Sequence, residues 1–375
     1  MIGRIQLNML AGSKFLPTPV PSAIIQAVKS IQVTVASGQR SGFQIVLANS
    51  RTSPLSTTMI PAGLLDPGMR VVMIATVNGL PSVLIDGIIT RQEAGFSNEI
   101  GQSAITLTGE DLTVLMDLEK KQGMIFPPLP AVGQVVWLLK NYLPYGVVPI
   151  TVPELFPDVP IPTDRIKGQD GTDYEFIQKL AKDNGYVFYL DPGPAPGMSK
   201  AYWGPEIRFG IPQPALNVDM DTMTNVDSLS FSFDGLQGKQ VTVSVQIPFT
   251  KLSIPVPLPD ISLLAPPLSV RPAPKLKSEP LPDTAKQNPI VAVAKGLAKM
   301  SDSADAVSGS GQLNVLRYGR VLQPRGLVGV RGAGLGYDGL YYVKSVTHNI
   351  KPGEYTQSFS LARNGLVSIT PVVPV

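Results

Sequence analysis

The feature that most constrains this chain is a series of short strand-like runs in its first 110 residues. β-Branched and apolar residues alternate there with polar ones, and Gly, Pro, Asn and Ser separate the runs. This pattern is typical of strands that bury one face. The runs are Ile31–Val35, Phe43–Leu47, Arg70–Thr76, Ser82–Ile89 and Ala104–Thr108. Strands at this spacing predict an antiparallel β-barrel or sandwich over residues 1–110.

The periodicity changes over residues 111–200, where helical spacing appears among strands. Thr172 and Glu175 form a T-x-x-E capping box at the start of a helix predicted over Asp173–Asn184. Gly185 stands where a left-handed residue would end that helix. The other elements predicted here are helices at Asp111–Lys121 and Ala131–Leu143 and a strand at Tyr186–Leu190. We therefore expect an α/β insert at 111–200.

Strands resume in residues 201–375, which we expect to form a second β-barrel region. They are predicted at Glu206–Phe209, Leu229–Phe233, Val241–Gln246, Gln312–Tyr318, Leu327–Val330, Leu340–Ile350 and Glu354–Ala362, with a short helix at Ile290–Met300. Residues 247–289 interrupt them, because eleven of these 43 residues are proline. Proline cannot donate a hydrogen bond inside a sheet. This segment is therefore predicted to be extended, either as a surface linker or as an arm that lies on a neighbouring subunit.

Composition excludes several classes of function. The chain has no cysteine, so it has no disulfides, thiolate zinc sites or cysteine nucleophiles. Its one histidine excludes HExxH and two-histidine metal sites. A net charge of +3 is too small for a nucleic-acid-binding surface. Charged residues make up only 16% and the mean hydropathy is +0.15, which favours a chain that covers much of its surface in an assembly.

Three sites that resemble catalytic or binding motifs have simpler interpretations. Gly332–Gly336 fails the dinucleotide-binding pattern and is predicted to be a hairpin turn. Asn217, Asp219 and Asp221 mimic a calcium loop but lack its glycine and closing glutamate, which indicates an acidic turn. His348 lies on a predicted strand, on one face with Tyr342 and Val346, and no G-x-S-x-G accompanies it. We expect a packed strand histidine, no catalytic residues, no metal and no cofactor.

Charge is segregated along the chain. Residues 1–65 and 306–337 contain basic residues and no acidic ones. The charged residues of 202–235, in contrast, are acidic apart from one arginine. This is either chance placement on solvated faces or a set of complementary subunit contacts. The candidate interface residues are Arg40, Arg51, Arg317, Arg320, Arg325, Arg331, Asp219, Asp221 and Asp227.

Three stretches together resemble the hub proteins of contractile injection systems, namely the phage late-control protein D family and the hub part of VgrG. The first is Gly109–Asp117 (GEDLTVLMD). The second is Ile166–Asp191, which is similar to the family's helix–strand unit at Asp173, Phe176, Ile177, Leu180, Ala181, Gly185, Tyr186 and Phe188. The third is Gly329–Asn364, which resembles the family's C-terminal hairpin at Tyr337, Asp338, Gly339, His348 and the run FSLARN. The Pro-rich stretch 247–289 is longer than this family leads us to expect.

The resemblance implies a mostly β chain with an α/β insert, whose two tandem antiparallel β-barrels form a pseudo-six-fold trimeric ring. Such a ring would adapt a hexameric inner tube to a trimeric spike and form part of the central conduit. The implied partners are two further copies of this chain, the spike, the inner-tube protein and baseplate wedge components, without nucleic acid or membrane insertion. The N-terminus shows no signal peptide, so we expect synthesis in the cytoplasm and assembly into a phage tail or injection particle.

Two other functions stay open. A β-sandwich adhesin that binds carbohydrate would predict clusters of exposed aromatic residues, and Trp137 and Trp203 are the only tryptophans. A baseplate hydrolase that cuts cell-wall glycan would need a pair of carboxylates, and only the insert could supply a helical catalytic domain.

Overall fold

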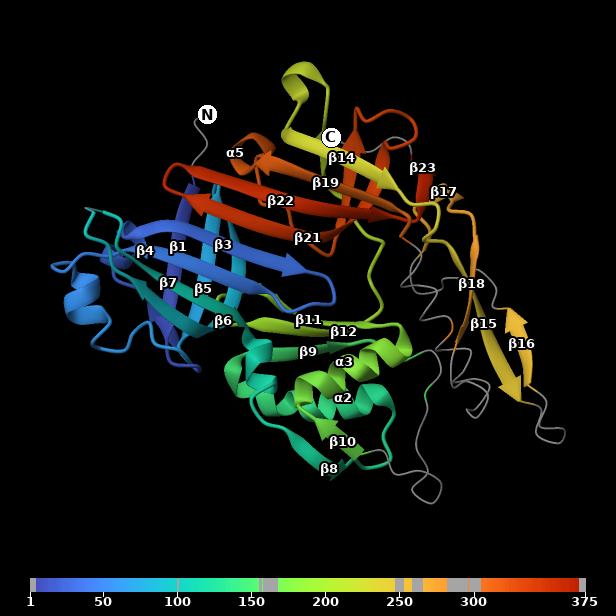
Figure 1. The fold of residues 1–375 in the computed structure, drawn as a ribbon, viewed down its shortest axis with the longest axis horizontal. Helices are drawn as coiled ribbons and strands as arrows, with labels where there is room; N and C mark the ends of the chain where they lie inside the picture. The colour runs from blue at the N-terminus through green and yellow to red at the C-terminus, as the bar shows by residue number, and fades with distance from the viewer. Residues whose placement is uncertain are drawn as a thin grey trace.

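The fold was analysed in a computed structural model, which describes residues 5–99, 101–154, 157, 168–246, 253–257, 266–281, 296 and 305–370. Strands dominate these residues (Figure 1), which confirms the prediction of a mostly β chain. No helix among them is both long and apolar enough to cross a bilayer. The predicted helix Ile290–Met300 lies outside the described residues, apart from Gly296.

The first β region contributes seven strands and two short helices. They are β1 (Ile5–Gly12), β2 (Pro17–Pro19), α1 (Ser22–Gln26), β3 (Val28–Ala36), β4 (Gly42–Ala48), the π-helix η1 (Leu55–Met59), β5 (Arg70–Val77), β6 (Leu80–Gly95) and β7 (Ala104–Asp111). All five strands predicted here are present. Their alternation buries one face, as in β3, where Ile31, Val33 and Val35 are at most 3% exposed.

The second β region supplies the remaining strands of the same sheet. They are β13 (Gln213–Asn217), β14 (Val226–Phe233), β19 (Val307–Asn314), β20 (Leu327–Arg331), β21 (Gly339–Lys351) and β22 (Glu354–Arg363). The main path of the sheet is β14-β19-β22-β21-β3-β4-β7-β6-β5-β1-β2, and β13 and β20 branch from β21. Apart from the parallel pair β13–β20, its strands pair antiparallel.

The two β regions are joined by direct strand pairing. β21 pairs antiparallel with β3, from Ser345 opposite Ala36 to Ile350 opposite Ile31. Residues far apart in the sequence therefore share one sheet and one continuous core, which includes Val33 and Val346. Two closed barrels are not shown by this strand order and stay a prediction.

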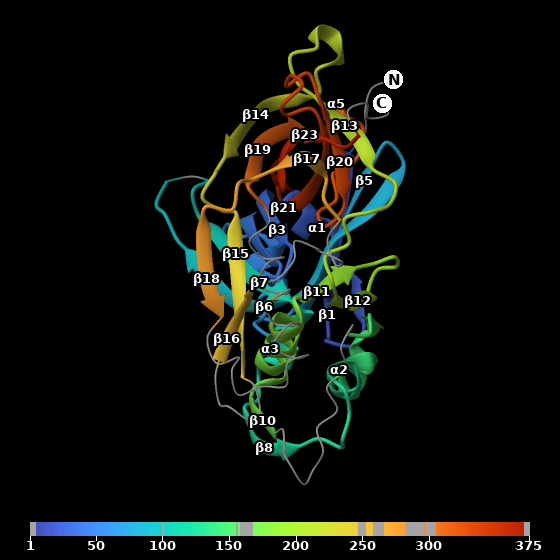
Figure 2. The same cartoon turned by 90° about the vertical axis from the view of Figure 1, so that its right-hand side faces the viewer.

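The insert packs below this sheet as a separate layer (Figure 2). Its elements are η2 (Leu112–Met116), β8 (Lys121–Ile125), α2 (Ala131–Leu139), η3 (Lys140–Tyr145), β9 (Val147–Thr151), β10 (Gly168–Gly171), α3 (Asp173–Asn184), β11 (Val187–Pro192) and β12 (Ser199–Gly204). Helices α2 and α3 pack with the sheet β11-β12-β9 around a core that contains Phe176, Leu180 and Trp203.

Helix α3 forms as its sequence predicts. Thr172 Oγ1 accepts a hydrogen bond from the Glu175 N–H at 3.2 Å, and the Glu175 side chain accepts one from the Thr172 N–H at 2.9 Å. Gly185 ends the helix at φ 67°, in the left-handed region. The capping box and the glycine stop are both confirmed.

One predicted helix and one predicted strand are shorter than the sequence pattern indicated. The helix predicted over Asp111–Lys121 is only the short 3₁₀ helix η2, followed by β8. The strand predicted over Gln312–Tyr318 ends at Asn314, because Asn314 Oδ1 accepts hydrogen bonds from the N–H groups of Leu316 and Arg317 and so caps the short helix α5 (Val315–Tyr318).

Two further predictions failed where the chain leaves regular pairing. Glu206–Phe209 is not a strand, because it pairs with no neighbouring strand in the described residues; its Glu206 and Arg208 side chains instead form part of an ionic cluster. On β21, a bulge between Val343 and Ser345 shifts the alternation by one residue, so Tyr342 leaves the face of Val346 and His348.

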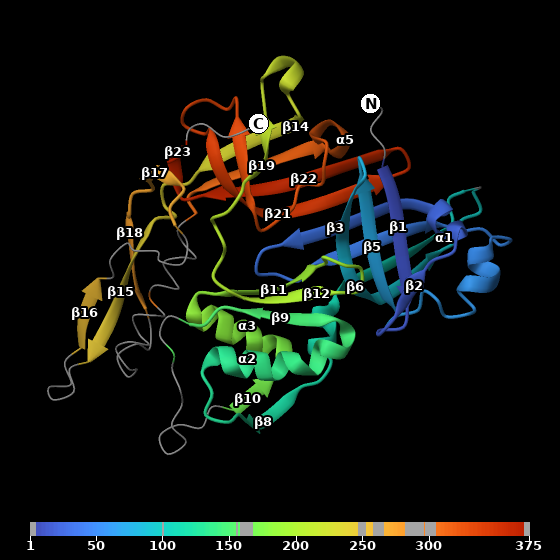
Figure 3. The same cartoon turned by 180° about the vertical axis from the view of Figure 1, so that it is seen from behind.

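The described parts of the Pro-rich segment do pair in sheets, which corrects the expectation of an unpaired linker. β16 (Ser253–Pro257) and β18 (Lys277–Leu281) flank β15 (Lys239–Gln246), and β17 (Ser269–Pro272) pairs with β23 (Gly365–Ser368). In the three-stranded sheet β16-β15-β18, the prolines lie on the two edge strands, where no ladder hydrogen bond is required on the outer side. The sheet extends to one side of the molecule (Figure 3).

Candidate functional site

The acidic residues of the GEDLTVLMD stretch attach the insert to the hairpin between β3 and β4. Arg40, in that hairpin, binds Glu110 at 3.2 Å and Asp117 at 2.5 Å, and its guanidinium lies 3.9 Å from the centroid of the Tyr174 ring. Asp111 is 3% exposed and accepts a hydrogen bond from the Ser41 N–H at 2.8 Å. Arg40 was predicted to lie at a subunit interface, and its charge is used inside the chain.

The second stretch is organised around the buried carboxylate of Asp173. Its oxygens accept hydrogen bonds from Lys121 Nζ at 2.8 Å, the Tyr142 hydroxyl at 2.8 Å and Gln169 Nε2 at 2.6 Å. Phe176, Leu180 and Gly185 of the same stretch form the core face and the end of α3. Asp173 is therefore a structural anchor that connects β8, η3 and β10 to α3.

The third stretch contains a hairpin whose connection is stabilised by hydrogen bonds from Arg363. Arg363 is fully buried and donates hydrogen bonds to the carbonyl oxygens of Asp338, Gly336 and Gly365 at 2.7–2.9 Å. Gly339 has φ 114°, and a Cβ there would lie 2.1 Å from the Ser368 Cβ, so only glycine fits. The hairpin turn predicted at Gly332–Gly336 is confirmed, because these residues lie in the connection between the antiparallel strands β20 and β21.

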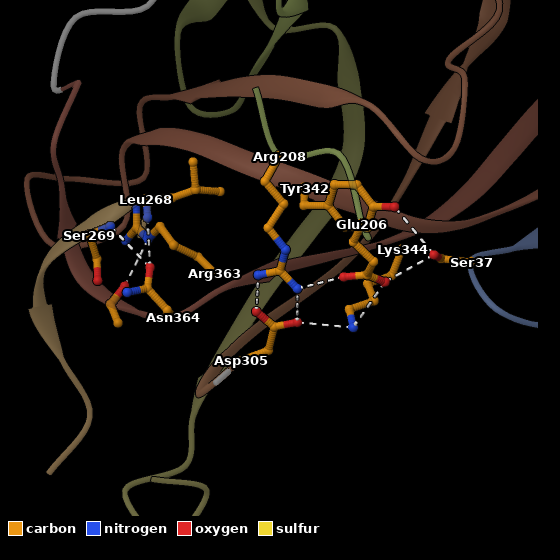
Figure 4. Close-up of polar contacts among 11 residues, drawn as sticks. Ser37, Glu206, Arg208, Leu268, Ser269, Asp305, Tyr342, Lys344, Arg363 and Asn364 are labelled. Carbon is orange, nitrogen blue, oxygen red and sulfur yellow. Dashed lines mark hydrogen bonds and ion pairs between the residues drawn. The ribbon is translucent and has the colours of Figure 1, made fainter. Parts of the chain in front are cut away.

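Asn364, next to Arg363, fixes the Pro-rich segment to this hairpin. Its Oδ1 accepts hydrogen bonds from the N–H groups of Leu268 and Ser269 at 2.9 and 3.0 Å (Figure 4). Gly365 allows the close approach of the two chains, because a Cβ there would lie 1.9 Å from the Arg271 carbonyl oxygen.

His348 is a packed strand histidine, as predicted. Its Nδ1 is hydrogen-bonded to the Tyr355 hydroxyl at 2.7 Å, and Gln357 Nε2 lies 3.3 Å away. Complete burial lowers the pKa of His348 to about 4, so the ring is neutral at physiological pH. Together with Val35 and Asp191, it lines a small pocket where the first β region, the insert and the second β region meet.

An ionic cluster that the sequence did not suggest crosses the same boundary (Figure 4). Arg208 is 4% exposed and binds Asp305 through both terminal nitrogens, at 2.5 and 2.8 Å, and Glu206 at 2.7 Å. Lys344 of β21 reaches Asp305 at 2.9 Å, and Ser37 of the first region donates to Glu206 at 2.9 Å. Burial alone would raise the pKa of Asp305, but the charges of Arg208 and Lys344 outweigh it and hold that pKa below its usual range.

Two more buried arginines fix the insert to the β regions. Arg70 forms a bidentate ion pair with Asp86 at 2.6–2.7 Å, with side-chain exposures of 1% and 0%. Arg325 donates to the carbonyl oxygens of Ala36 in β3 and Leu190 in β11, at 2.9 and 3.1 Å. A sequence signal for the first pair is Asp86, the one charge in the apolar run Val83–Ile89 of β6.

The remaining candidate interface residues lie nearer the surface. Arg51, Arg320, Asp219 and Asp221 are exposed, and Arg331 is half-buried. Arg317 and Asp227 form a partly exposed ion pair with each other at 2.9 Å. No group of three histidine, aspartate or glutamate side chains suited to a metal ion occurs in the part of the chain that the structure describes. The candidate interface charges therefore either form contacts within the chain or lie at its surface.

Comparison with known proteins places this architecture in a class. No protein-family model matches the sequence, and a search of the curated proteins finds no match. Solved structures do match over nearly the full length, and they are phage tail proteins and related components of secretion systems.

Three structures illustrate the likeness. A tail protein of Neisseria meningitidis superposes with a TM-score of 0.62 and 14% identity, over 97% of this chain and 98% of that one. The 43 kDa tail protein of prophage MuSo2 from Shewanella oneidensis gives 0.64 and 12%, over 96% and 99%. The E. coli c3393 protein gives 0.52 and 11%, over 93% and 78%, and is a type VI secretion system component described as similar to the phage T4 tail proteins gp27 and gp5. This chain has the fold of these tail and secretion-system proteins.

Proposed function

We propose that this chain is a structural hub of a phage tail or contractile injection system, with a role that is mechanical rather than catalytic. The observation that carries the proposal is that this chain superposes on two tail proteins over at least 96% of its own length and at least 98% of theirs. Three copies would form a ring that adapts a hexameric inner tube to a trimeric spike and surrounds part of the central conduit. Baseplate wedge components would contact its outside.

The contacts within the chain suit a part that transmits force. The sheet is continuous through β3 and β21, and the buried side chains of Arg70 and Arg325 attach the first and second β regions to the insert through the carbonyl oxygens of Gly197 and Leu190. A thrust applied to one region would therefore reach the others through hydrogen bonds and buried ion pairs rather than through a flexible linker. The low charge content and the exposed apolar side chains, among them Phe96, Phe209 and Ile211, fit a chain that buries more surface on assembly.

The candidate subunit contacts are the charges that the fold leaves exposed. Arg51, Arg320, Asp219 and Asp221 are exposed, whereas Arg40 and Arg325 are bound inside the chain. Complementary charges of this kind would fix the orientation of neighbouring subunits more than they would add affinity.

The test is the absolute mass of the purified protein by light scattering. Three chains of 40.0 kDa predict a mass of about 120 kDa, and particles of that mass should show a ring with a central channel in negative stain. If the chain alone has a mass of 40.0 kDa, a trimeric spike protein from the same tail or injection system is added. A chain that stays monomeric with the spike present contradicts the proposal and favours the carbohydrate-binding alternative.

A further inference from the structure

An exposed apolar patch crosses the boundary between the first β region and the insert. Phe15, Leu16, Leu143 and Met198 are 61%, 74%, 50% and 42% exposed, and these four residues are called the Phe15 patch. The Phe15 ring stacks on that of Tyr145, with 5.0 Å between the ring centroids. Exposed apolar side chains of the first β region and of the η3 segment of the insert therefore lie beside each other.

A buried ion pair holds this patch in place. Arg70, paired with Asp86, donates hydrogen bonds to the carbonyl oxygens of Lys14 at 2.9 Å and Gly197 at 3.0 Å. These are the residues immediately before Phe15 and Met198. The patch is therefore presented by a rigid support, which lowers the entropy lost when a partner binds.

Positive charges flank the patch. Lys14 precedes Phe15, and the exposed Lys200 follows Met198 by two residues. Neither lysine forms an ion pair with a carboxylate of the described residues, and residues 1–65 contain no acidic residue at all. Such a rim favours a partner that presents an apolar side chain beside carboxylates.

The chain itself carries a surface of that chemistry. Residues 218–225, called the Met223 loop, connect β13 to β14 and project from the body of the molecule (Figures 1 and 2). Met223 is 49% exposed, and Asp219 and Asp221 beside it are exposed. At the base of the loop, Asn217 N–H donates to Asn225 Oδ1 at 2.8 Å, which fixes its two ends together.

We propose that the Met223 loop of one copy docks on the Phe15 patch of a second copy, with Asp219 and Asp221 facing Lys14 and Lys200. This inference rests on the proposed self-assembly and names the two surfaces that carry it. Because the surfaces differ, the contact is head-to-tail, and it gives a closed ring when the rotation between copies closes.

Site-specific crosslinking tests the contact directly, because the chain has no native cysteine. Leu16→Cys and Met223→Cys are purified separately, mixed and oxidised. The mixture should yield a reducible species of about 80 kDa, two chains of 40.0 kDa, that is at least tenfold more abundant than in either variant alone. Phe96→Cys replaces Met223→Cys in the control, because Phe96 is 80% exposed on the β6–β7 connection.

Charge reversal gives a second readout. Asp219→Lys with Asp221→Lys should weaken self-association at least tenfold, and adding Lys14→Glu and Lys200→Glu should restore it. If the wild type is a trimer but the reversal has no effect and crosslinking equals the control, the docking is wrong while the ring survives. If the reversal of Lys14 and Lys200 abolishes binding to anionic phosphatidylserine vesicles and leaves assembly unchanged, the patch is a lipid contact and the inference is overturned.

Discussion

Arg70 and Arg325 perform the same task in opposite ways. Each is a buried arginine that ties the insert to a β region through carbonyl oxygens. Arg70 has a fully buried carboxylate, Asp86, as its bidentate partner. Arg325 has only Asp191, at 3.5 Å and with a side chain 49% exposed, and its Nε has no hydrogen-bond partner among the described residues.

The backbone shows the same difference. Arg325 adopts φ 63°, a left-handed conformation that non-glycine residues seldom take. Burial lowers the pKa of Arg325, and its guanidinium stacks 3.8 Å from the centroid of the Tyr189 ring. Arg70 is therefore held by a carboxylate that neutralises its charge. Arg325 has a strained backbone and no buried ion-pair partner, and it is held mainly by two carbonyl oxygens and an aromatic ring. The Arg70 contact should therefore tolerate the loss of its arginine less well than the Arg325 contact.

The largest effect is expected for Arg70→Met. It leaves the Asp86 carboxylate buried without a counter-ion, which should lower the free energy of unfolding by about 3–5 kcal/mol. The measurement is denaturant-induced unfolding followed by tryptophan fluorescence. Arg91→Met is the control, because the Arg91–Glu93 pair is exposed and its loss should cost at most about 0.5 kcal/mol.

A double variant shows whether the buried charge is the cause. Arg70→Met with Asp86→Leu removes both charges, so it should be more stable than Arg70→Met alone. A double variant as unstable as the sum of the two single variants would mean that the lost hydrogen bonds to Lys14 and Gly197, not the orphaned carboxylate, dominate.

His348 provides an acid-sensitive point at the pocket where the three regions meet. Its folded pKa of about 4 lies below the ordinary 6.5, so the unfolded chain takes up a proton first as the pH falls. Stability should be constant above pH 6.5 and decline between pH 6.5 and 4, by about 3 kcal/mol in total. Urea unfolding across this range should show the decline in the wild type and a flatter profile in His348→Gln. Equal slopes in both proteins would assign the decline to carboxylates.

The local structure of this chain could be predicted from sequence because its causes lie within a few residues. The period-two runs mark β3 to β7, and Thr172, Glu175 and Gly185 mark both ends of α3. The three motif stretches also identify residues that prove to be buried anchors, such as Asp173.

The long-range contacts could not be predicted in this way. Nothing in the alternation of β21 specifies β3 as its neighbour, since any strand with the same period fits. The sequence did not mark Arg208 as buried, because its acidic partners lie both beside it, at Glu206, and far along the chain, at Asp305. Whether a charge is buried depends on tertiary contacts, so segregation along the sequence did not separate Arg325 from Arg51.

Arg325→Met tests the weaker of the two contacts. Its ion-pair partner Asp191 is 49% exposed, and the nearby buried Asp111 keeps its hydrogen bonds from Ser41 and Thr113. The loss should therefore be about 1–2 kcal/mol, from two hydrogen bonds and the ring contact. The same unfolding assay gives the value, with Arg317→Met as the control because Arg317 is 53% exposed. A loss as large as that of Arg70→Met would mean that carbonyl dipoles hold a buried cation as firmly as a carboxylate does, and the contrast would disappear.

The smallest effect is expected at the partly exposed contact around Arg40. Thr172→Ala removes the N-cap of α3 and the 2.6 Å hydrogen bond to Asp117, which in turn binds Arg40. Thr172→Ser keeps both hydrogen bonds and is the matched control. Loss of the cap should lower the free energy of unfolding by about 1 kcal/mol in the alanine variant only. Hydrogen exchange should quicken in the first turn of α3 and, if Asp117 transmits the change, in the β3–β4 hairpin as well. Faster exchange in α3 alone would show that this contact, unlike the two buried arginines, does not couple the insert to the sheet.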